Sequence, residues 1–220
     1  VTVTNVNDAP VITSGGGGDA AAVNTAENTT AATTVAANDQ NGDAVSFSIT
    51  GGADAARFAI DPDSGVLRFL AAPDFENPGD ADGDNNYVVI VQASDGVGGT
   101  DSQTITVAVT DANEAPTITS DGGGGVAAVN IAENTTGLTT VAANDVDGDP
   151  VTFSITGGAD AAQFDIDPAT GALSFRTAPD FETPTDADGD NVYVVTVQAS
   201  DGAGGTDTDR KSTRLNSSHQ

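Results

Sequence analysis

The stretch YVVIVQAS at residues 87–94 decides the fold class of this chain. Alternate side chains of a β-strand point to opposite faces, and here every second residue is apolar or small, namely Tyr87, Val89, Val91 and Ala93. The stretch YVVTVQAS at 193–200 keeps this face, whereas Ile90 on the opposite face becomes Thr196. The kept face is therefore predicted to be core, and the changed face to be surface.

The two stretches belong to two copies of one unit. A shift of 106 residues aligns 9–102 with 115–208 without a gap, and 69 of these 94 positions are identical. Self-similarity at a domain-sized period indicates a tandem array in which each copy has its own core. We therefore expect the end of a preceding repeat and its linker at 1–8, a whole repeat at 9–114 and a second repeat at 115–208.

Short strands separated by turn residues account for the rest of each copy. Six further segments in the first copy have strand character: 9–13, 33–37, 45–50, 57–60, 65–69 and 104–110. No helical periodicity competes with them. Seven strands in about 100 residues predict an all-β fold, with each repeat an immunoglobulin-like Greek-key β-sandwich.

The last twelve residues break the pattern. Residues 209–219, DRKSTRLNSSH, are the translation of a DNA sequence that resembles a standard sequencing-library adapter. We interpret 209–220 as not native and exclude it from fold reasoning; the alternative is a genuine basic tail. On this interpretation the second repeat lacks its last strand, the equivalent of 103–110, and has an open sheet edge.

Composition excludes several classes of function. The chain has 33 acidic and 6 basic residues, a net charge of -27 and no cysteine, and its one lysine (Lys211) and one histidine (His219) lie in the last ten residues. Thiol chemistry, disulfides, histidine-ligated metals and nucleic-acid or anionic-membrane binding are therefore not expected. No apolar run of about 18 residues is present to span a bilayer. Because the chain begins with Val1, we expect an internal piece of a longer protein.

The acidic residues fall in clusters at predicted strand ends. The first copy and its flanks contain NVND (5–8), AEN (26–28), NDQNGD (38–43), PDFE (73–76), DADGDN (80–85), SDG (94–96) and DANE (111–114). Two like charges about 4 Å apart repel by roughly 4 kcal/mol at an effective dielectric of 20, so clustered carboxylates favour a divalent ion. Ca²⁺ suits them better than Mg²⁺, since it accepts 6–8 oxygen ligands in loose geometry. The alternative is a solvated acidic surface that keeps the chain soluble.

These motifs, in this order and spacing, resemble the cadherin repeat, and specifically the bacterial cadherin-like units of large surface adhesins. The resemblance covers residues 1–208 and implies calcium at the junction between consecutive repeats. For the intact junction it implies the ligands Glu27, Asp74, Glu76, Asp111, Asn113, Glu114, Asp145, Asp147 and Asp201. The family linker reads Asp-x-Asn-Asp-Asn, whereas Glu114 and Ala115 stand here in its last two places, which leaves the number of ions open.

Two further junctions have only part of the expected set of ligands in this sequence. The upstream one comprises Asn5, Asn7, Asp8, Asp39, Asn41 and Asp95, and the downstream one Glu133, Asp180 and Glu182. The DADGDN loops form a separate class, with Asp80, Asp82 and Asp84 in the first copy and Asp186, Asp188 and Asp190 in the second. Their spacing resembles half of an EF-hand loop without its twelfth-position glutamate, so an ion site and an ordinary Asp/Gly turn both stay open.

The resemblance implies a calcium-binding module of an extracellular cell-adhesion protein at the cell surface. The module would act as a calcium-rigidified spacer, or as a segment that adheres to other adhesin copies or to host and surface ligands. No enzymatic activity is expected, because the paired carboxylates recur at every domain end. The alternative is a carbohydrate-binding β-sandwich of a secreted hydrolase, which needs an exposed aromatic patch that a chain with two tyrosines and no tryptophan hardly offers.

Overall fold

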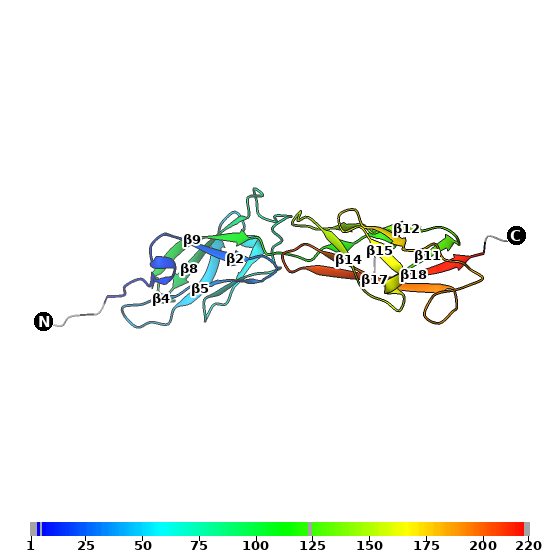
Figure 1. Ribbon diagram of the computed structural model, residues 1–220. Coiled ribbons are helices and arrows are strands. Elements are labelled where there is room, and N and C mark those ends of the chain that lie inside the picture. The colour runs from blue at the N-terminus through cyan, green and yellow to red at the C-terminus, as the bar shows by residue number, and fades with distance from the viewer. Residues whose placement is uncertain (1–3, 5, 123–124, 218–220) are drawn as a thin grey trace. The chain divides into compact units, whose positions relative to one another are not determined.

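The computed structural model describes residue 4 and residues 6–122 and 125–217, in two compact units, Val1–Ala112 and Asn113–Gln220 (Figure 1). The division falls close to the boundary expected at 114/115. Each unit consists of short strands with two single turns of 3-10 helix, η1 (Ser14–Gly16) and η2 (Ala55–Arg57) in unit 1, and η3 (Ser120–Gly122) and η4 (Ala161–Gln163) in unit 2. Within the described residues, no helix has the length and hydropathy needed to cross a membrane.

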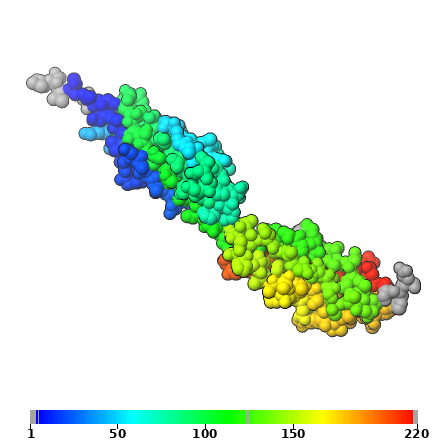
Figure 2. Space-filling view, turned by 90° about the horizontal axis from the view of Figure 1, so that it is seen from above, coloured from blue at the N-terminus to red at the C-terminus, as the bar shows by residue number. Residues whose placement is uncertain are grey.

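Unit 1 is a sandwich of two sheets. Its strands are β1 (Val11–Ile12), β2 (Ala20–Ala26), β3 (Ala31–Thr34), β4 (Ala37–Asn38), β5 (Ser46–Gly51), β6 (Phe58–Ile60), β7 (Val66–Phe69), β8 (Asn86–Ser94) and β9 (Thr100–Thr110). One sheet has the order β2-β9-β8-β5 and the other β3-β7-β6, while β1 pairs with β4. All pairs are antiparallel except β2 with β9, which brings blue and green segments side by side in this unit (Figure 2).

Unit 2 repeats this topology strand for strand. Its strands are β10 (Thr117–Ile118), β11 (Val126–Ala132), β12 (Gly137–Thr140), β13 (Ala143–Asn144), β14 (Thr152–Gly157), β15 (Phe164–Ile166), β16 (Ala172–Phe175), β17 (Val192–Ser200) and β18 (Thr206–Asn216). The sheets run β11-β18-β17-β14 and β12-β16-β15. The all-β immunoglobulin-like sandwich predicted from the strand pattern is confirmed.

The predicted core face is the observed core. Tyr87 is 2% exposed and Val89, Val91 and Ala93 are each 0% exposed, as are all four of their counterparts on β17. Tyr87 packs edge-on against Phe69 at a centroid distance of 5.0 Å, and Phe69 lies 4.5 Å from Phe58. Unit 2 repeats this aromatic group, so each unit buries its own core.

The strand β2 was not among the predicted strands. Its sequence, AAAVNTA, is rich in alanine, which has a low β propensity, and the glycine run 15–18 precedes it. All four of these glycines have positive φ, which glycine adopts readily, and this lets the chain turn from β1 into β2. β2 forms its main-chain hydrogen bonds with β9, and the local sequence of β2 does not predict this pairing.

The prediction that the second repeat lacks its last strand is wrong. β18 continues through Asn216 and pairs antiparallel with β17 from Thr206 to Arg214 and parallel with β11 from Arg210 to Asn216. Without β18, the facing edges of β11 and β17 would leave N–H and C=O groups unpaired, and the main chain of an extended segment can satisfy them whatever its side chains. The adapter interpretation stays a prediction, and residues 218–220, with His219, lie outside the described residues.

We expect Leu67→Ala to lower the free energy of unfolding of unit 1 by about 2–5 kcal/mol, because the side chain is 0% exposed and its loss leaves a cavity. The neighbouring Val66→Ala, at a site 42% exposed, should change it by no more than about 0.5 kcal/mol. Urea unfolding followed by circular dichroism measures both, and Leu173→Ala gives the matched loss in unit 2. Equal effects of the two unit 1 variants would contradict the core assignment.

Candidate metal centres

Glu27 organises the end of unit 1 at which β9 stops. Its side chain is 2% exposed, and its backbone N–H donates to the Thr110 carbonyl at 3.0 Å. Oε1 accepts a hydrogen bond from the Ala112 N–H (2.9 Å) and Oε2 accepts one from the Phe75 N–H (2.8 Å). The buried Glu27 carboxylate thus connects the segment after β9 with the PDFE loop (73–76). The acids of that loop therefore lie next to Glu27.

Three carboxylates meet here. One oxygen each from Glu27, Asp74 and Glu76 lies within 4.8 Å of the others. The same group recurs in unit 2 as Glu133, Asp180 and Glu182, where Glu133 is 4% exposed and accepts from the Phe181 N–H at 3.0 Å. Hard cations such as Ca²⁺ are held by oxygen atoms grouped in this way. The predicted exit-side ligands are therefore brought together in both copies, with Asp111 immediately beyond β9.

The other end of unit 2 gathers the predicted entry-side ligands. The Asn113 amide donates to Asp201 Oδ2 at 2.9 Å, and the Glu114 N–H donates to Asp147 Oδ2 at 2.8 Å. Asp145 Oδ1 accepts from the Asp147 N–H at 3.1 Å, and oxygens of Asp145, Asp147 and Asp149 lie within 4.8 Å of one another. The linker and both acidic loops therefore form one connected group within this unit.

Unit 1 has an equivalent entry end. Asn7 Nδ2 donates to Asp95 Oδ2 at 2.7 Å, and the Asp8 N–H donates to Asn41 Oδ1 at 2.7 Å. Asn41 thus occupies the place that Asp147 has in unit 2, with the same backbone contact but without the charge. Asp39 Oδ1 accepts from the Asn41 N–H at 2.8 Å. Asn5, also predicted for this junction, lies outside the described residues.

Two buried carboxylate oxygens are suited to binding a cation. Asp39 Oδ2 and its counterpart Asp145 Oδ2 are shielded from solvent and accept no hydrogen bond in the part of the chain that the structure describes. A buried carboxylate oxygen without a partner is costly, and a metal ion satisfies it as well as a donor does. The donor set in both copies is therefore compatible with a hard divalent ion.

Asp95 and Asp201 each accept several hydrogen bonds, on both carboxylate oxygens. Asp201 Oδ1 accepts from the N–H groups of Ala203, Gly204 and Gly205, and Oδ2 accepts from Asn113 and again from Gly205. The hydrogen bond from the Asn113 amide is the main cause that lowers the pKa of Asp201. Burial acts in the opposite direction, and the backbone donors lower the pKa further. Asn7 lowers the pKa of Asp95 in the same way. Both carboxylates stay ionised, and an ion that contacts them competes with these donors.

The DADGDN loops place three acids together without a junction. Oxygens of Asp80, Asp82 and Asp84 lie within 4.8 Å of one another, and Asp80 Oδ2 accepts from the Gly83 N–H at 2.7 Å. Burial opposes ionisation of Asp80, yet the backbone donors, led by Asp84, keep its pKa low. The hydrogen bond to Asp80 and the charge of Asp84 raise the pKa of Asp82.

The second DADGDN loop follows the first. Burial opposes ionisation of Asp186, yet the Asp190 N–H and further donors lower its pKa. The hydrogen bond to Asp186 and the charge of Asp190 raise the pKa of Asp188. In both copies, the neighbouring aspartates therefore raise the pKa of the middle acid of the loop.

Asp54 is an acid of structural importance that the sequence analysis did not select. It is 5% exposed, its Oδ1 accepts from the Ala81 N–H and its Oδ2 from the Val88 N–H, both at 2.7 Å, and it so anchors the DADGDN loop to β8. Asp160 does the same in unit 2. The available signal was the motif GGADAA, which both copies keep unchanged at 51–56 and 157–162.

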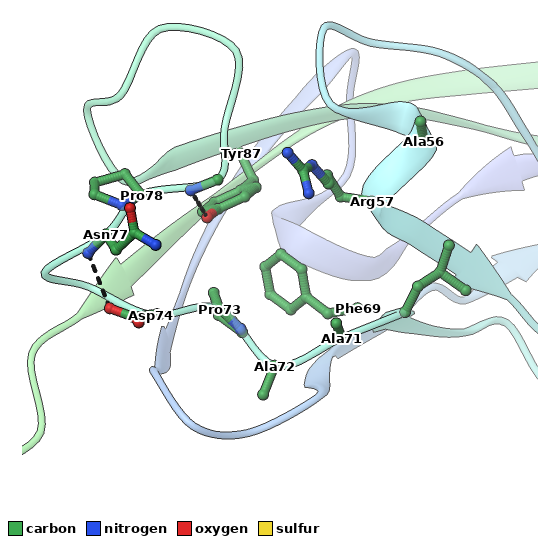
Figure 3. A pocket seen from close by; sticks show the side chains of 12 residues that line it. Ala56, Arg57, Phe69, Ala71, Ala72, Pro73, Asp74, Asn77, Pro78 and Tyr87 are labelled. Atoms are coloured by element: carbon green, nitrogen blue, oxygen red, sulfur yellow. Dashed lines mark hydrogen bonds between the residues drawn. The ribbon is translucent and has the colours of Figure 1, made fainter.

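A cavity of about 450 Å³ adjoins the exit end of unit 1 (Figure 3). Its lining includes Arg57, Phe69, Asp74 and Tyr87. The two aromatic side chains are only 1% and 2% exposed, and the Tyr87 hydroxyl accepts from the Gly79 N–H at 2.9 Å. They belong to the core and present no flat face on which a sugar ring could stack, which counts against the carbohydrate-binding alternative.

Comparisons with known families relate the chain to cadherin and bacterial immunoglobulin-like domains. Residues 127–216 match the family described as Cadherin domain, and residues 7–108 match the family described as Bacterial Ig domain. Among curated proteins, mouse Protocadherin Fat 2 is 32% identical over 166 residues, which is 70% of this chain but 3% of that protein. Halomucin of Haloquadratum walsbyi is 54% identical over 37 residues, 17% of this chain and 0% of that protein after rounding. The chain therefore spans a very small part of the relatives it matches.

Solved structures show the same fold. Human Protocadherin-24 EC1-2 superposes with a TM-score of 0.61 at 19% identity, covering 96% of this chain and 100% of that one. The extracellular cadherin domains 1-4 of Protocadherin Gamma B7 superpose with a TM-score of 0.54 at 22% identity, covering 96% and 52%. At these identities the likeness concerns the fold alone.

We expect Asn113→Ala to raise the pKa of Asp201, because it removes the amide that contributes most to lowering it. The folded-state pKa is depressed, so the stabilisation is present above the unfolded value of about 3.9 and is lost as pH falls through the folded value. The variant should therefore lose stability less steeply in that acid range. Carboxyl-carbon NMR titration measures the pKa, with Asn7→Ala as the control that shifts Asp95 and not Asp201. An unchanged Asp201 pKa would refute the role of Asn113.

Proposed function

The chain belongs to the cadherin-like repeat family, and from this premise we propose that it is a calcium-binding segment of an extracellular cell-adhesion protein, of the kind found in large surface adhesins. The main support is the group of three carboxylates around a buried glutamate, Glu27 in unit 1 and Glu133 in unit 2. The structural relatives include domains described as extracellular. Cadherin-like adhesion domains are generally not enzymes, and we propose no catalytic activity for this chain.

We propose that the main ion site lies at the linker. Glu27 accepts the Ala112 N–H, and Asn113, the next residue, donates to Asp201. One peptide bond therefore joins a residue held by the exit-side acids to a residue held by the entry-side acids. The proposed ligands are the nine predicted for this junction: Glu27, Asp74, Glu76, Asp111, Asn113, Glu114, Asp145, Asp147 and Asp201.

Electrostatics supports divalent ions over a bare acidic surface. Oxygens within 4.8 Å of one another repel by about 3–4 kcal/mol per charged pair at an effective dielectric of 20. Glu27 cannot swing away, because two backbone N–H groups hold it. A domain with a total stability of about 5–15 kcal/mol gains substantially when ions cancel such repulsion.

The remaining predicted sites are proposed as weaker or local ones. Asn7, Asp8, Asp39, Asn41 and Asp95 would hold an ion together with a preceding repeat, and Glu133, Asp180 and Glu182 one together with a following linker. Each DADGDN loop would hold one ion through its three aspartates. The acids of the first loop converge without any junction, and in the second loop Asp188 interacts with both Asp186 and Asp190. Asn41 brings no charge where Asp147 does, so we expect the upstream site to bind calcium less tightly than the linker site.

We propose that calcium turns the tandem into a stiff spacer. Sites of the extracellular type fill at millimolar calcium, and ions that bind only the assembled junction stabilise it by mass action. Neighbouring repeats of the same chain are the first partners. Adhesion of this segment to other adhesin copies or to surface ligands is the second candidate role.

Calcium titration into the full chain tests the linker site. We expect Asp74→Asn/Glu76→Gln to weaken calcium binding at the linker at least tenfold, because it removes two of the three grouped charges. Asp63→Asn, an exposed acid in the turn after β6, is the matched control and should bind as the parent does. Isothermal titration calorimetry gives affinities and stoichiometry, and Asp82→Asn/Asp188→Asn should reduce only the number of ions. Equal affinities for the double variant and the control would refute the linker site.

Solution scattering tests the spacer role. With calcium we expect a distance distribution with a narrow spread of long distances, and with a chelator a broader one, because the linker then bends freely. Asp74→Asn/Glu76→Gln should give the broad distribution in both conditions. If the parent chain gives the same distribution with calcium and with chelator, the repeats bind calcium without acting as a calcium-dependent spacer.

A further inference from the structure

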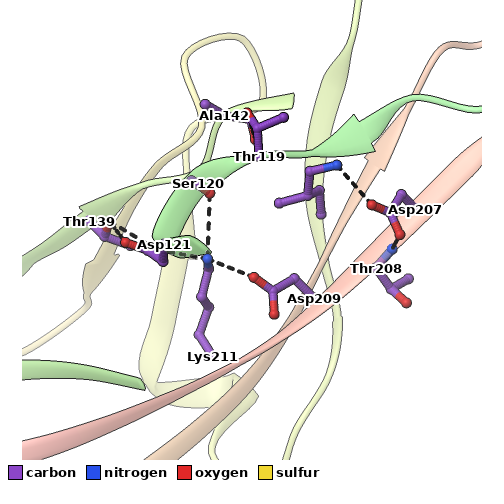
Figure 4. Close-up of polar contacts among 10 residues, drawn as sticks. Thr119, Ser120, Asp121, Thr139, Ala142, Asp207, Thr208, Asp209 and Lys211 are labelled. Atoms are coloured by element: carbon purple, nitrogen blue, oxygen red, sulfur yellow. Dashed lines mark hydrogen bonds and ion pairs between the residues drawn. The ribbon is translucent and has the colours of Figure 1, made fainter. Parts of the chain in front are cut away.

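The strand β18 places charged and polar side chains into the core of unit 2, at positions where the equivalent strand of unit 1 is mainly apolar. Its inward residues are Asp209, Lys211, Thr213 and Leu215, with exposed fractions of 1%, 0%, 0% and 1%. Figure 4 shows Lys211 between Asp209 and Asp121. The equivalent inward positions of β9 carry Gln103, Ile105, Val107 and Val109. Two charged residues and a hydroxyl thus occupy places where the sister strand has an amide and two apolar side chains.

The buried charges of β18 are only partly compensated. Lys211 Nζ lies 2.7 Å from Asp121 Oδ2 and 2.7 Å from Asp209 Oδ2. Within the described residues, Asp209 Oδ1 and Thr213 Oγ1 have no hydrogen-bond partner, and Asp209 Oδ2 has only the ion pair with Lys211. Buried ion pairs seldom recover the cost of their desolvation, and unsatisfied buried polar atoms add to it.

In the slot between β11 and β17, the side formed by β17 is apolar. On β17, Val197 stands opposite Asp209, Val195 opposite Lys211, and Tyr193 opposite Thr213. All three β17 residues are 0% exposed. In unit 1 the corresponding pairs are Gln103 with Val91, Ile105 with Val89, and Val107 with Tyr87. The slot is therefore built for alternating apolar side chains, which β18 does not supply.

We propose that the slot between β11 and β17 is a strand-binding site that takes up a free extended segment with the pattern of Thr104–Thr110, TITVAVT, in place of β18. The occupant is the last strand of another copy of this repeat, presented as an unpaired strand. Both strands form the same main-chain ladder, so the side chains decide which one is bound. This proposal does not depend on calcium binding.

Trypsin provides a direct readout of strand exchange. The described part of β18 contains Arg210, Lys211 and Arg214, whereas a peptide with the sequence of residues 100–112, TDSQTITVAVTDA, contains no lysine or arginine. When this peptide is added to the full chain, we expect cleavage after Arg210, Lys211 and Arg214 to accelerate at least tenfold. Cleavage after the exposed Arg176, in the loop following β16, should stay constant. Mass spectrometry assigns the sites, with calcium and with chelator in parallel.

Two controls test side-chain selection. A peptide in which the residues equivalent to Ile105, Val107 and Val109 are threonine should not accelerate cleavage. The full-chain variant Asp209→Gln/Lys211→Ile/Thr213→Val gives β18 the pattern of β9; it should unfold at a higher temperature, and the peptide should not accelerate its cleavage at Arg210 and Arg214. The proposal is overturned if the parent peptide leaves cleavage of the parent chain unchanged, or if the threonine peptide acts equally well.

Discussion

Backbone N–H groups that hold carboxylates in place are the constraint on which both ends of each unit depend. Glu27 receives two such donors and joins the exit from β9 to the PDFE loop. Asp54 receives two and fixes the DADGDN loop. Asp201 receives its donors from the hairpin between β17 and β18. The acids therefore determine the loop conformations before any ion is considered, and the repulsion among them follows from that fixed placement.

This arrangement divides the acids into two groups. Asp54, Asp95 and Asp201 have both oxygens engaged by donors, so they act mainly as anchors. Asp74 and Glu76 lie at the surface beside the anchored Glu27 and bring two further charges to its group. In the proposed ion sites, the second group would supply most of the charge and the first group would fix the geometry. Sequence motifs alone do not distinguish the two groups, because the donors that hold an anchor can lie far from it in the chain, as the Ala81 and Val88 N–H groups do for Asp54.

The sequence predicted those features that arise from alternation. The core face of Tyr87 to Ala93 needed only a period of two, and a second copy confirmed it through the change from Ile90 to Thr196. The strand β2 escaped prediction because its partner, β9, is about 80 residues away in the chain and its own residues are mostly alanine. Asp54 escaped for a similar reason: its donors come from Ala81 and Val88, which a local motif does not reveal. Tertiary pairing decided both cases.

One strand, β9, runs from one acidic end of unit 1 to the other. Its length decides whether a single ion could contact the acids of both ends. Glu27 lies at the end of β9, whereas Asp95 precedes its start. β9 has eleven residues, so about 33 Å separates the two groups of acids. A single ion reaches ligands only about 2.5 Å away. One ion therefore cannot neutralise both ends of one unit. Under the proposed function, the number of ion sites would grow with the number of junctions, so stiffness would be a property of the array and not of the isolated sandwich.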